Sequence, residues 1–152
     1  MKGGPLPGLL RPPLIFLAAI LSGVALNRAW SLKFIPPGFG WLGALVSFCA
    51  VLLFLFSFRQ FRRAGTSVRG TERTTTIVQT GPYRFSRNPI YLSFILLVTG
   101  LSVWMNDLWL LLMLIPAIAC ITVLVIPREE RFLESNFRDR YATYRATVRR
   151  WL

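Results

Sequence analysis

The chain has 152 residues, of which 54% are hydrophobic, yet its 18 lysine and arginine residues against 6 acidic ones give it a formal charge of +12. A soluble domain of this size buries only about two thirds of its unfolded surface, too little to conceal so many apolar side chains. The absence of histidine excludes a Ser-His-Asp triad, a histidine general base and a zinc site built on imidazole. We therefore expect a membrane protein without a metal site, with apolar and basic residues separated along the chain.

Four uncharged stretches predict transmembrane helices at about residues 12–28, 39–58, 89–106 and 108–126. Because a helix rises about 1.5 Å per residue, about 20 residues cross a hydrocarbon core of roughly 30 Å. The first stretch is the shortest and follows Lys2 and Arg11, so it also has the features of a secretory signal peptide. The predicted fold class is all-α, a single polytopic domain over residues 1–152 with cytoplasmic segments at 59–88 and 127–152.

Arginine is concentrated between the second and third spans and after the fourth. These arginines are Arg59, Arg62, Arg63, Arg69, Arg73, Arg84 and Arg87, then Arg128, Arg131, Arg138, Arg140, Arg145, Arg149 and Arg150. Positive residues stay on the cytoplasmic side of a membrane, so both segments and both termini are predicted to be cytoplasmic. We expect a bacterial or archaeal cytoplasmic membrane, with lipid headgroups rather than nucleic acid as the partner of this charge.

Only Asn106 and Asp107 separate the third and fourth spans. A connection this short requires an antiparallel helical hairpin, in which Asp107 can cap the start of the fourth span. Cys49 and Cys120 lie within apolar stretches and are expected to behave as small hydrophobic side chains.

A polar segment precedes the third span. Thr74–Thr80 is rich in β-branched residues and is predicted to be extended, and Gly81-Pro82 predicts a turn. Asn88-Pro89 predicts the start of the third span, with the asparagine as N-cap. The helix N-terminus beside Arg84 and Arg87 could bind an anion, or these arginines could contact lipid phosphate, and the residues alone leave both open.

After the fourth span an amphipathic helix is predicted. Its apolar residues recur every three or four positions: Leu133, Phe137, Tyr141, Tyr144, Val148 and Trp151. Glu129 lies on the same face, where a carboxylate needs a partner or a ligand. Glu129 and Glu130 could equally be charges that complement the helix dipole, so both interpretations stay open. Glu134 lies four residues before Arg138 and is predicted to form a surface ion pair with it.

Two motifs flank the predicted hairpin. Residues 81–91, GPYRFSRNPIY, resemble the pattern GPYRxxRHPxY, and residues 129–144 resemble EExxLxxxFGxxYxxY. In this order the two motifs resemble the isoprenylcysteine carboxyl methyltransferase family, within the wider group of membrane phospholipid and thiol methyltransferases. The chain differs at Asn88, where the family usually has histidine, at Arg138, where it often has glycine, and at Val125, where eukaryotic members carry a substrate-facing arginine.

The resemblance implies an integral membrane enzyme that binds S-adenosylmethionine between the two motifs on the cytoplasmic side. The residues it implies for cofactor binding are Ile77, Val78, Tyr83, Arg87, Asn88, Pro89 and Glu129. It implies that Glu130 supports Glu129 and that Arg128 orients the substrate. The implied catalytic residues are therefore Arg128 and Glu130. The implied substrate is a lipophilic small molecule or a lipidated protein, most like one with an isoprenylcysteine carboxylate.

The absence of histidine bears on the acceptor. Displacement at a sulfonium methyl group mainly requires alignment, and a carboxylate is already ionised at pH 7 without a general base. A thiol, or an amine that must lose a proton, fits less well. Two other interpretations stay open: a membrane reductase, in which arginines would bind the 2′-phosphate of NADPH, and a membrane subunit without enzymatic activity.

Overall fold

The computed structural model of the chain describes residues 11–65 and 76–152. Predictions for Lys2, Arg69, Arg73, Thr74 and Thr75, and for the rest of residues 1–10, lie outside the described residues. The elements are α1 (Pro12–Ala29), α2 (Gly40–Arg63), the 3₁₀-helix η2 (Gly81–Arg84), α3 (Pro89–Met105), α4 (Leu108–Cys120), the π-helix η3 (Ile121–Val125) and α5 (Ile126–Thr147). The described residues form helices and no strands, so the predicted all-α class is confirmed.

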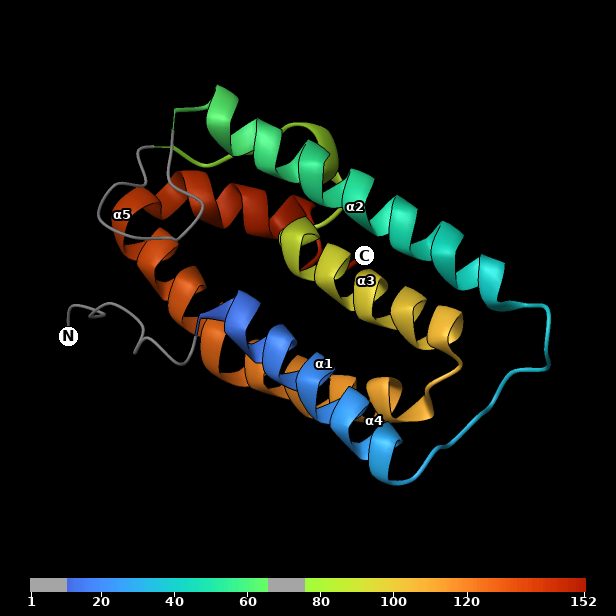
Figure 1. Cartoon of the computed structure of the whole chain (residues 1–152). Helices are drawn as coiled ribbons and strands as arrows, with labels where there is room; N and C mark the ends of the chain where they lie inside the picture. Colours follow the sequence, from blue (N-terminus) through green and yellow to red (C-terminus); the bar gives the residue numbers. More distant parts are fainter. Residues whose placement is uncertain (1–10, 66–75) are drawn as a thin grey trace.

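The helices are arranged around α3, which packs against α2 on one side and α4 on the other, while α1 lies along α4 (Figure 1). The α3–α4 connection is as short as the sequence predicts, because Asn106 adopts a left-handed conformation with φ 52°. Oδ1 of Asp107 accepts a 2.9 Å hydrogen bond from the backbone N–H of Trp109, which confirms the predicted cap. The hydroxyl of Ser102 donates a 2.6 Å bond to the Asp107 carbonyl and fastens the turn.

Two glycines set the approach of α2 to α3. A Cβ on Gly43 would lie 2.2 Å from the backbone nitrogen of Trp104, and a Cβ on Gly100 would lie 2.4 Å from Oγ of Ser47. Real Cβ atoms essentially never come this close to other heavy atoms. Small residues at a helix–helix contact allow the two backbones to pack directly, as is common in membrane proteins.

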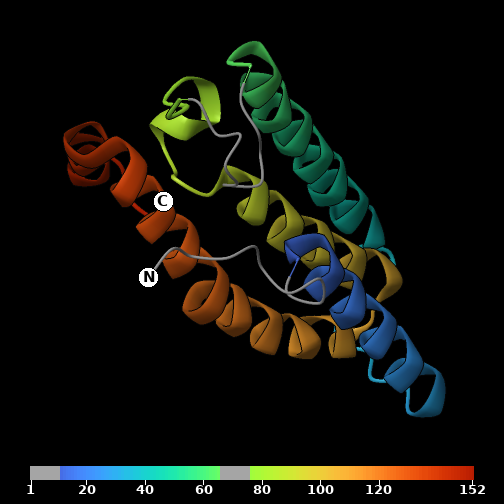
Figure 2. The same ribbon diagram turned by 90° about the vertical axis from the view of Figure 1, so that its left-hand side faces the viewer.

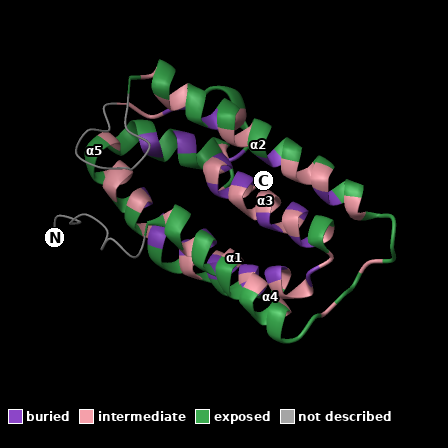
Figure 3. Cartoon of the chain, in the orientation of Figure 1, coloured by how far each residue is buried: buried purple, intermediate pink, exposed green. Residues whose placement is uncertain are grey.

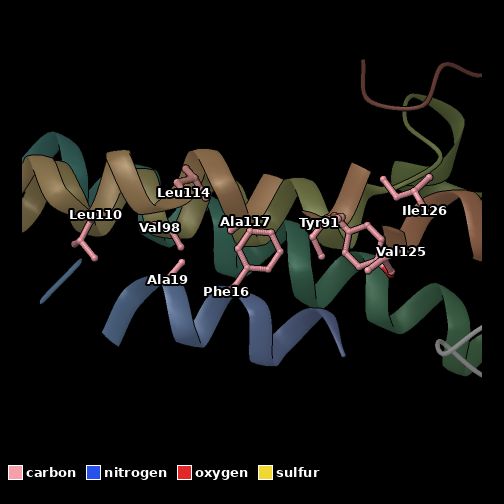
Figure 4. Close-up of a cluster of buried hydrophobic side chains, with 10 residues drawn as sticks. Phe16, Ala19, Tyr91, Val98, Leu110, Leu114, Ala117, Val125 and Ile126 are labelled. Carbon is pink, nitrogen blue, oxygen red and sulfur yellow. The ribbon is translucent and has the colours of Figure 1, made fainter. Parts of the chain in front are cut away.

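The hydrophobic core lies between α1, α3 and α4 and extends to the start of α5 (Figure 4). Its buried members are Phe16, Ala19, Tyr91, Val98, Leu110, Leu114, Ala117, Ile121, Val125 and Ile126. Gly23 allows α1 to approach α4, since a Cβ there would lie 2.8 Å from Cδ2 of Leu110. Phe94 joins the two sides of α3, with its ring 5.2 Å from that of Phe16 in α1 and 5.6 Å from that of Phe54 in α2.

The outward faces of the helices are largely exposed (Figure 3). Many of the exposed residues are large and apolar. Leu21, Phe48, Ile115 and Val123 are 61%, 61%, 64% and 68% exposed. Such a surface is unfavourable in water and is normal against lipid. The helical runs Pro12–Ala29, Gly40–Arg63 and Leu108–Thr147 are long and apolar enough to cross a membrane, and Pro89–Met105 is a shorter apolar helix. These helices are compatible with an integral membrane protein.

The run from α4 through η3 into α5 is continuous and curved (Figure 2). A π-helical turn such as η3 is a recognised cause of helix bending. Within α5 the backbone breaks at Arg138, where φ is 36° and ψ is −110°, and the second half of the helix turns back (Figure 1). Because of this break Glu134 pairs with Arg145, so the predicted pair with Arg138 is wrong.

A helix after the fourth predicted span is confirmed as α5, but the break at Arg138 divides it, so the prediction of one continuous helical face is wrong. The helix is also shorter than the apolar spacing predicts. It ends at Thr147, and Val148 is extended with φ −121° and ψ 131°. The predicted helical face is therefore wrong for Val148 and Trp151, which lie on an irregular segment beyond the helix.

Candidate functional site

A pocket lies where α2 ends and α3 begins. This end of the molecule is opposite the α1–α2 connection (Figure 1). The pocket contains about 640 Å³ of space free of protein atoms, including its open mouth. Its lining residues are Phe61, Thr76, Ile77, Val78, Tyr83, Arg87, Asn88, Ile126, Glu129, Glu130, Leu133, Tyr141 and Tyr144. They come from the end of α2, the segment before α3, and α5.

Contacts to both α2 and α5 hold the wall of the pocket around η2. The hydroxyl of Tyr144 donates a 2.8 Å hydrogen bond to the carbonyl of Tyr83. The ring of Phe61 in α2 meets the Tyr83 ring edge-on, with the centroids 5.3 Å apart. The hydroxyl of Thr80 donates a 2.9 Å bond to Oε1 of Gln60, also in α2. Burial raises the pKa of Tyr83 and of Tyr144, so both phenols stay protonated and can donate.

The chain reaches η2 through a turn that depends on Gly81. Thr80 is extended, with φ −103° and ψ 160°, and Gly81 follows with φ 61°, a conformation that glycine adopts without steric cost. The predicted turn at Gly81-Pro82 is thus present as the start of η2. Val78 is buried and Ile77 is partly buried, and together they form an apolar part of the lining.

The third span begins as predicted, with Asn88 at the N-cap position and Pro89 as the first helical residue. The Asn88 side chain does not cap the helix. Its Nδ2 instead donates a 3.0 Å hydrogen bond to the carbonyl of Arg150. The hydroxyl of Ser86 accepts a 3.1 Å bond from the Asn88 backbone N–H. The side-chain amide of Asn88 thus connects the start of α3 to the segment that follows α5.

Glu130 is buried and is paired with two arginines. Its Oε1 lies 2.9 Å from Nη1 of Arg87, and its Oε2 lies 2.7 Å from Nη2 of Arg150. Nε of Arg150 donates a further 3.2 Å bond to Oε1, and Nη1 of Arg87 also donates to the Tyr141 hydroxyl at 3.2 Å. Two cations compensate the burial of this carboxylate. Nε of Arg87 is buried and has no hydrogen-bond partner among the described residues.

Glu129 differs from its neighbour. Within residues 11–65 and 76–152, it makes no ion pair, and its carboxylate accepts a 2.7 Å hydrogen bond from the hydroxyl of Tyr91. Burial raises the pKa of Glu129 to about 7, the Tyr91 hydrogen bond opposes this rise, and the negative charge of Glu130 adds to it. A cationic ligand beside Glu129 would stabilise its ionised form.

The pocket brings together seven of the nine residues assigned by resemblance: Ile77, Val78, Tyr83, Arg87, Asn88, Glu129 and Glu130. Pro89 is buried in the first turn of α3 and does not line the pocket. Arg128 is exposed on α5 and is not among the lining residues.

Several residues of this region were not assigned from the sequence. The tyrosine of the first motif, Tyr91, is part of the pattern quoted above, so its position was a usable signal. Leu133, Tyr141 and Tyr144 belong to the apolar face of α5, and that spacing predicted packing only. Phe61 and Arg150 carried no sequence signal, because they reach the region through the length of α2 and the path of the chain after α5.

A family model described as phospholipid methyltransferase matches residues 39–140, about two thirds of the chain. The chain belongs to the phospholipid methyltransferase family. An uncharacterized protein of Haemophilus influenzae is similar, with 40% identity over 63 residues that cover 41% of this chain and all of that protein. No solved structure matches the chain. Membership of the phospholipid methyltransferase family supports a methyltransferase, and the matched region includes most of the pocket.

Proposed function

We propose that the protein is a membrane methyltransferase that binds S-adenosylmethionine in the pocket between the segment before α3 and α5. The observation that carries this proposal is the contrast between Glu130, which has two arginine partners, and Glu129, which has none among the described residues. A carboxylate without a cationic partner is suited to a positively charged ligand. S-adenosylmethionine carries an ammonium and a sulfonium, and its carboxylate could accept a hydrogen bond from the unpartnered Nε of Arg87.

The remaining lining residues fit the same cofactor. Ile77 and Val78 offer an apolar surface for the adenine ring, and Tyr83 adds an aromatic face. When bound, S-adenosylmethionine would supply a methyl group attached to a positively charged sulfur. A nucleophile would bond to the methyl carbon as the carbon–sulfur bond breaks and S-adenosylhomocysteine leaves. The task of the chain is alignment. The Glu130 ion pairs hold Arg87 in place, and the Tyr91 hydrogen bond orients Glu129.

We propose a lipophilic acceptor, most like an isoprenylcysteine carboxylate. The chain has no histidine, and a carboxylate is ionised at neutral pH without a base. The exposed apolar faces of the helices are in keeping with an acceptor that reaches the pocket from the bilayer. In this proposal Arg128, which is exposed on α5 and does not line the pocket, orients the acceptor as it approaches from the membrane surface.

We propose that the pocket faces the cytoplasm. At the pocket end, α2 finishes with Arg59, Arg62 and Arg63, and α5 begins with Arg128 and Arg131. The opposite end, formed by the α1–α2 connection and the helix ends beside it, bears two cations, Arg28 and Lys33, and exposed aromatic residues. These aromatic residues are Trp30 and Phe39 in the connection, Trp41 at the start of α2 and Trp104 at the end of α3. The charge difference follows the positive-inside rule, and aromatic residues are enriched at membrane interfaces.

The proposal is tested by ligand-dependent stabilisation of the full chain, purified in detergent. We expect S-adenosylhomocysteine to raise the thermal midpoint and NADPH to leave it unchanged. Stabilisation by NADPH alone would indicate a reductase, and stabilisation by neither would indicate a subunit without this activity; both results contradict the proposal. Calorimetry should show affinity for S-adenosylhomocysteine at least ten-fold weaker in Glu129→Gln and in Asn88→Ala, with Glu134→Gln, a change at an exposed ion pair, as control.

The acceptor is identified in a second experiment. A lipid and small-molecule extract is incubated with the protein and methyl-labelled S-adenosylmethionine, and the labelled products are analysed by mass spectrometry. We expect the label as a methyl ester on a lipophilic carboxylate. Label on an amine or a thiol would contradict the proposed acceptor while leaving the cofactor assignment in place.

A further inference from the structure

The segment Val148–Leu152, here called the strap, leaves α5 and runs against the start of α3. Three hydrogen bonds hold it there. The backbone N–H of Arg87 donates to the Arg149 carbonyl at 3.0 Å, and the Arg150 carbonyl accepts from the Ser86 hydroxyl at 3.3 Å and from Nδ2 of Asn88 at 3.0 Å. The strap therefore contacts three consecutive residues of the first motif without lining the pocket itself.

Arg150 also contacts the second motif. Its guanidinium binds Glu130 through two nitrogens, with Nη2 2.7 Å from Oε2 and Nε 3.2 Å from Oε1. Glu130 in turn holds Arg87 at 2.9 Å. One residue thus fixes Asn88 through its carbonyl and Glu130 through its side chain, and it connects both motifs from outside the pocket.

The strap is also anchored by apolar packing. Trp151 is partly buried and packs against the hydrophobic core. The Arg149 side chain is exposed, and the strap uses its carbonyl rather than its charge. Of the two strap arginines, Arg150 is therefore the one whose side-chain charge contacts the second motif.

We propose that the strap completes the cofactor site and that Arg150 is its positioning residue, which acts on the cofactor through Glu130, Arg87 and Asn88. This inference rests on the proposed function. Without Arg150, one of the two cations on a buried carboxylate is lost, and Glu130 must satisfy its second oxygen elsewhere. Arg87 and Asn88 then lose their fixed positions. The cost falls on cofactor affinity more than on folding, because Glu130 keeps Arg87 as a cationic partner and the hydrophobic core does not include the Arg150 side chain.

The test measures S-adenosylhomocysteine affinity by calorimetry and the ligand-free thermal midpoint for the full chain and three variants. Arg150→Ala should weaken binding at least ten-fold with a midpoint within a few degrees of the unsubstituted protein. Arg150→Lys should give an intermediate affinity, because a lysine ammonium keeps the charge but cannot reproduce the contact through two nitrogens. Arg149→Ala, the matched control, should bind as the unsubstituted protein does, since it retains the carbonyl that accepts from Arg87.

The outcomes separate the two proposals. If the unsubstituted protein fails to bind S-adenosylhomocysteine, the proposed function is wrong and the strap inference falls with it. If it binds and Arg150→Ala binds equally well, the strap inference alone is wrong. Equal losses in Arg149→Ala and Arg150→Ala would also overturn it, because they would indicate a general effect of charge. If Arg150→Ala does not fold, Arg150→Lys decides, and unchanged affinity in that variant contradicts the role of the two-nitrogen contact.

Discussion

The hydroxyl of Tyr91 donates a 2.7 Å hydrogen bond to Oε1 of Glu129 and so joins the first turn of α3 to the first turn of α5. The two residues are 38 positions apart and belong to different motifs. The bond favours the ionised form of Glu129, whereas burial raises the pKa of this carboxyl to about 7. The contact between the motifs therefore favours the negatively charged form of the group proposed to meet the cofactor.

Tyr91→Phe should shift the pH dependence of cofactor binding. Loss of the hydrogen bond removes an interaction that lowers the Glu129 pKa, so this pKa should rise above about 7. Affinity for S-adenosylhomocysteine at pH 7 should fall by about ten-fold, the scale of a hydrogen bond to a charged group. It should recover as pH rises toward about 9. Calorimetry at several pH values measures this.

Tyr144→Phe is the control for that experiment. It removes a hydrogen bond to the carbonyl of Tyr83, without a hydrogen bond to Glu129. Its affinity should fall without a shift of the pH profile. A Tyr91→Phe profile that coincides with that of the unsubstituted protein would disprove the role given to this hydrogen bond.

The stability of the ligand-free protein should decrease as pH rises from about 4.5 to about 7. Burial raises the Glu129 pKa from 4.5 to about 7, so within this window the folded state binds more protons than the unfolded state. The stabilisation that protonated Glu129 contributes is fully present below pH 4.5, the pKa in the unfolded chain, and is lost as the pH rises through about 7, the pKa in the folded protein. The difference corresponds to roughly 3 kcal/mol.

Glu129→Gln should remove this contribution, because a glutamine does not titrate. Thermal midpoints recorded from pH 5 to pH 8 should therefore change less in the variant than in the unsubstituted protein. Parallel curves for the two proteins would show that Glu129 does not carry the effect.

Arg138→Gly should stabilise the protein by about 1 kcal/mol. Arg138 has φ 36° and ψ −110°, a conformation that glycine adopts far more readily than a residue with a Cβ. The matched control is Arg140→Gly, at an exposed position two residues on in regular helix, where glycine should cost about 1 kcal/mol. Thermal midpoints should therefore move in opposite directions, and a decrease in both variants would argue against the break at Arg138.

Gly43→Ala should separate α2 from α3 and destabilise the protein by about 3 kcal/mol, at the upper end of the usual cost of overpacking. The added methyl group would lie 2.2 Å from the backbone nitrogen of Trp104, which cannot move away as a flexible side chain can. Gly40→Ala is the control, because its Cβ would lie 3.2 Å from the Trp104 carbonyl and a small shift suffices. Equal midpoints for the two variants would contradict this packing.

The sequence was informative where one physical effect dominates. Uncharged stretches located the apolar helices, and the short connection at Asn106 and Asp107 required the hairpin. It was uninformative where effects compete. The spacing of Val148 and Trp151 fits a helix, yet hydrogen bonds to the start of α3 hold that segment outside α5.

The break at Arg138 was also not predicted, because arginine favours a regular helix. For the site, motif order was enough to associate Tyr83 and Arg87 with Glu129, and the structure places all three around one pocket. Nothing local in the sequence could show that Arg150 would meet Glu130, since that ion pair depends on how the chain turns after α5.

The first helix, α1, has a separate place in this architecture. It packs along α4, and none of the described residues that line the pocket belongs to it. The family match begins at residue 39, after α1 has ended. Selection can therefore act on α1 mainly through the volume and hydrophobicity of the side chains that pack in the core, as at Ala19 and Gly23. Among relatives, the sequence of this helix should diverge fastest, and another apolar helix should be able to replace it. The residues that line the pocket lie in the rest of the chain.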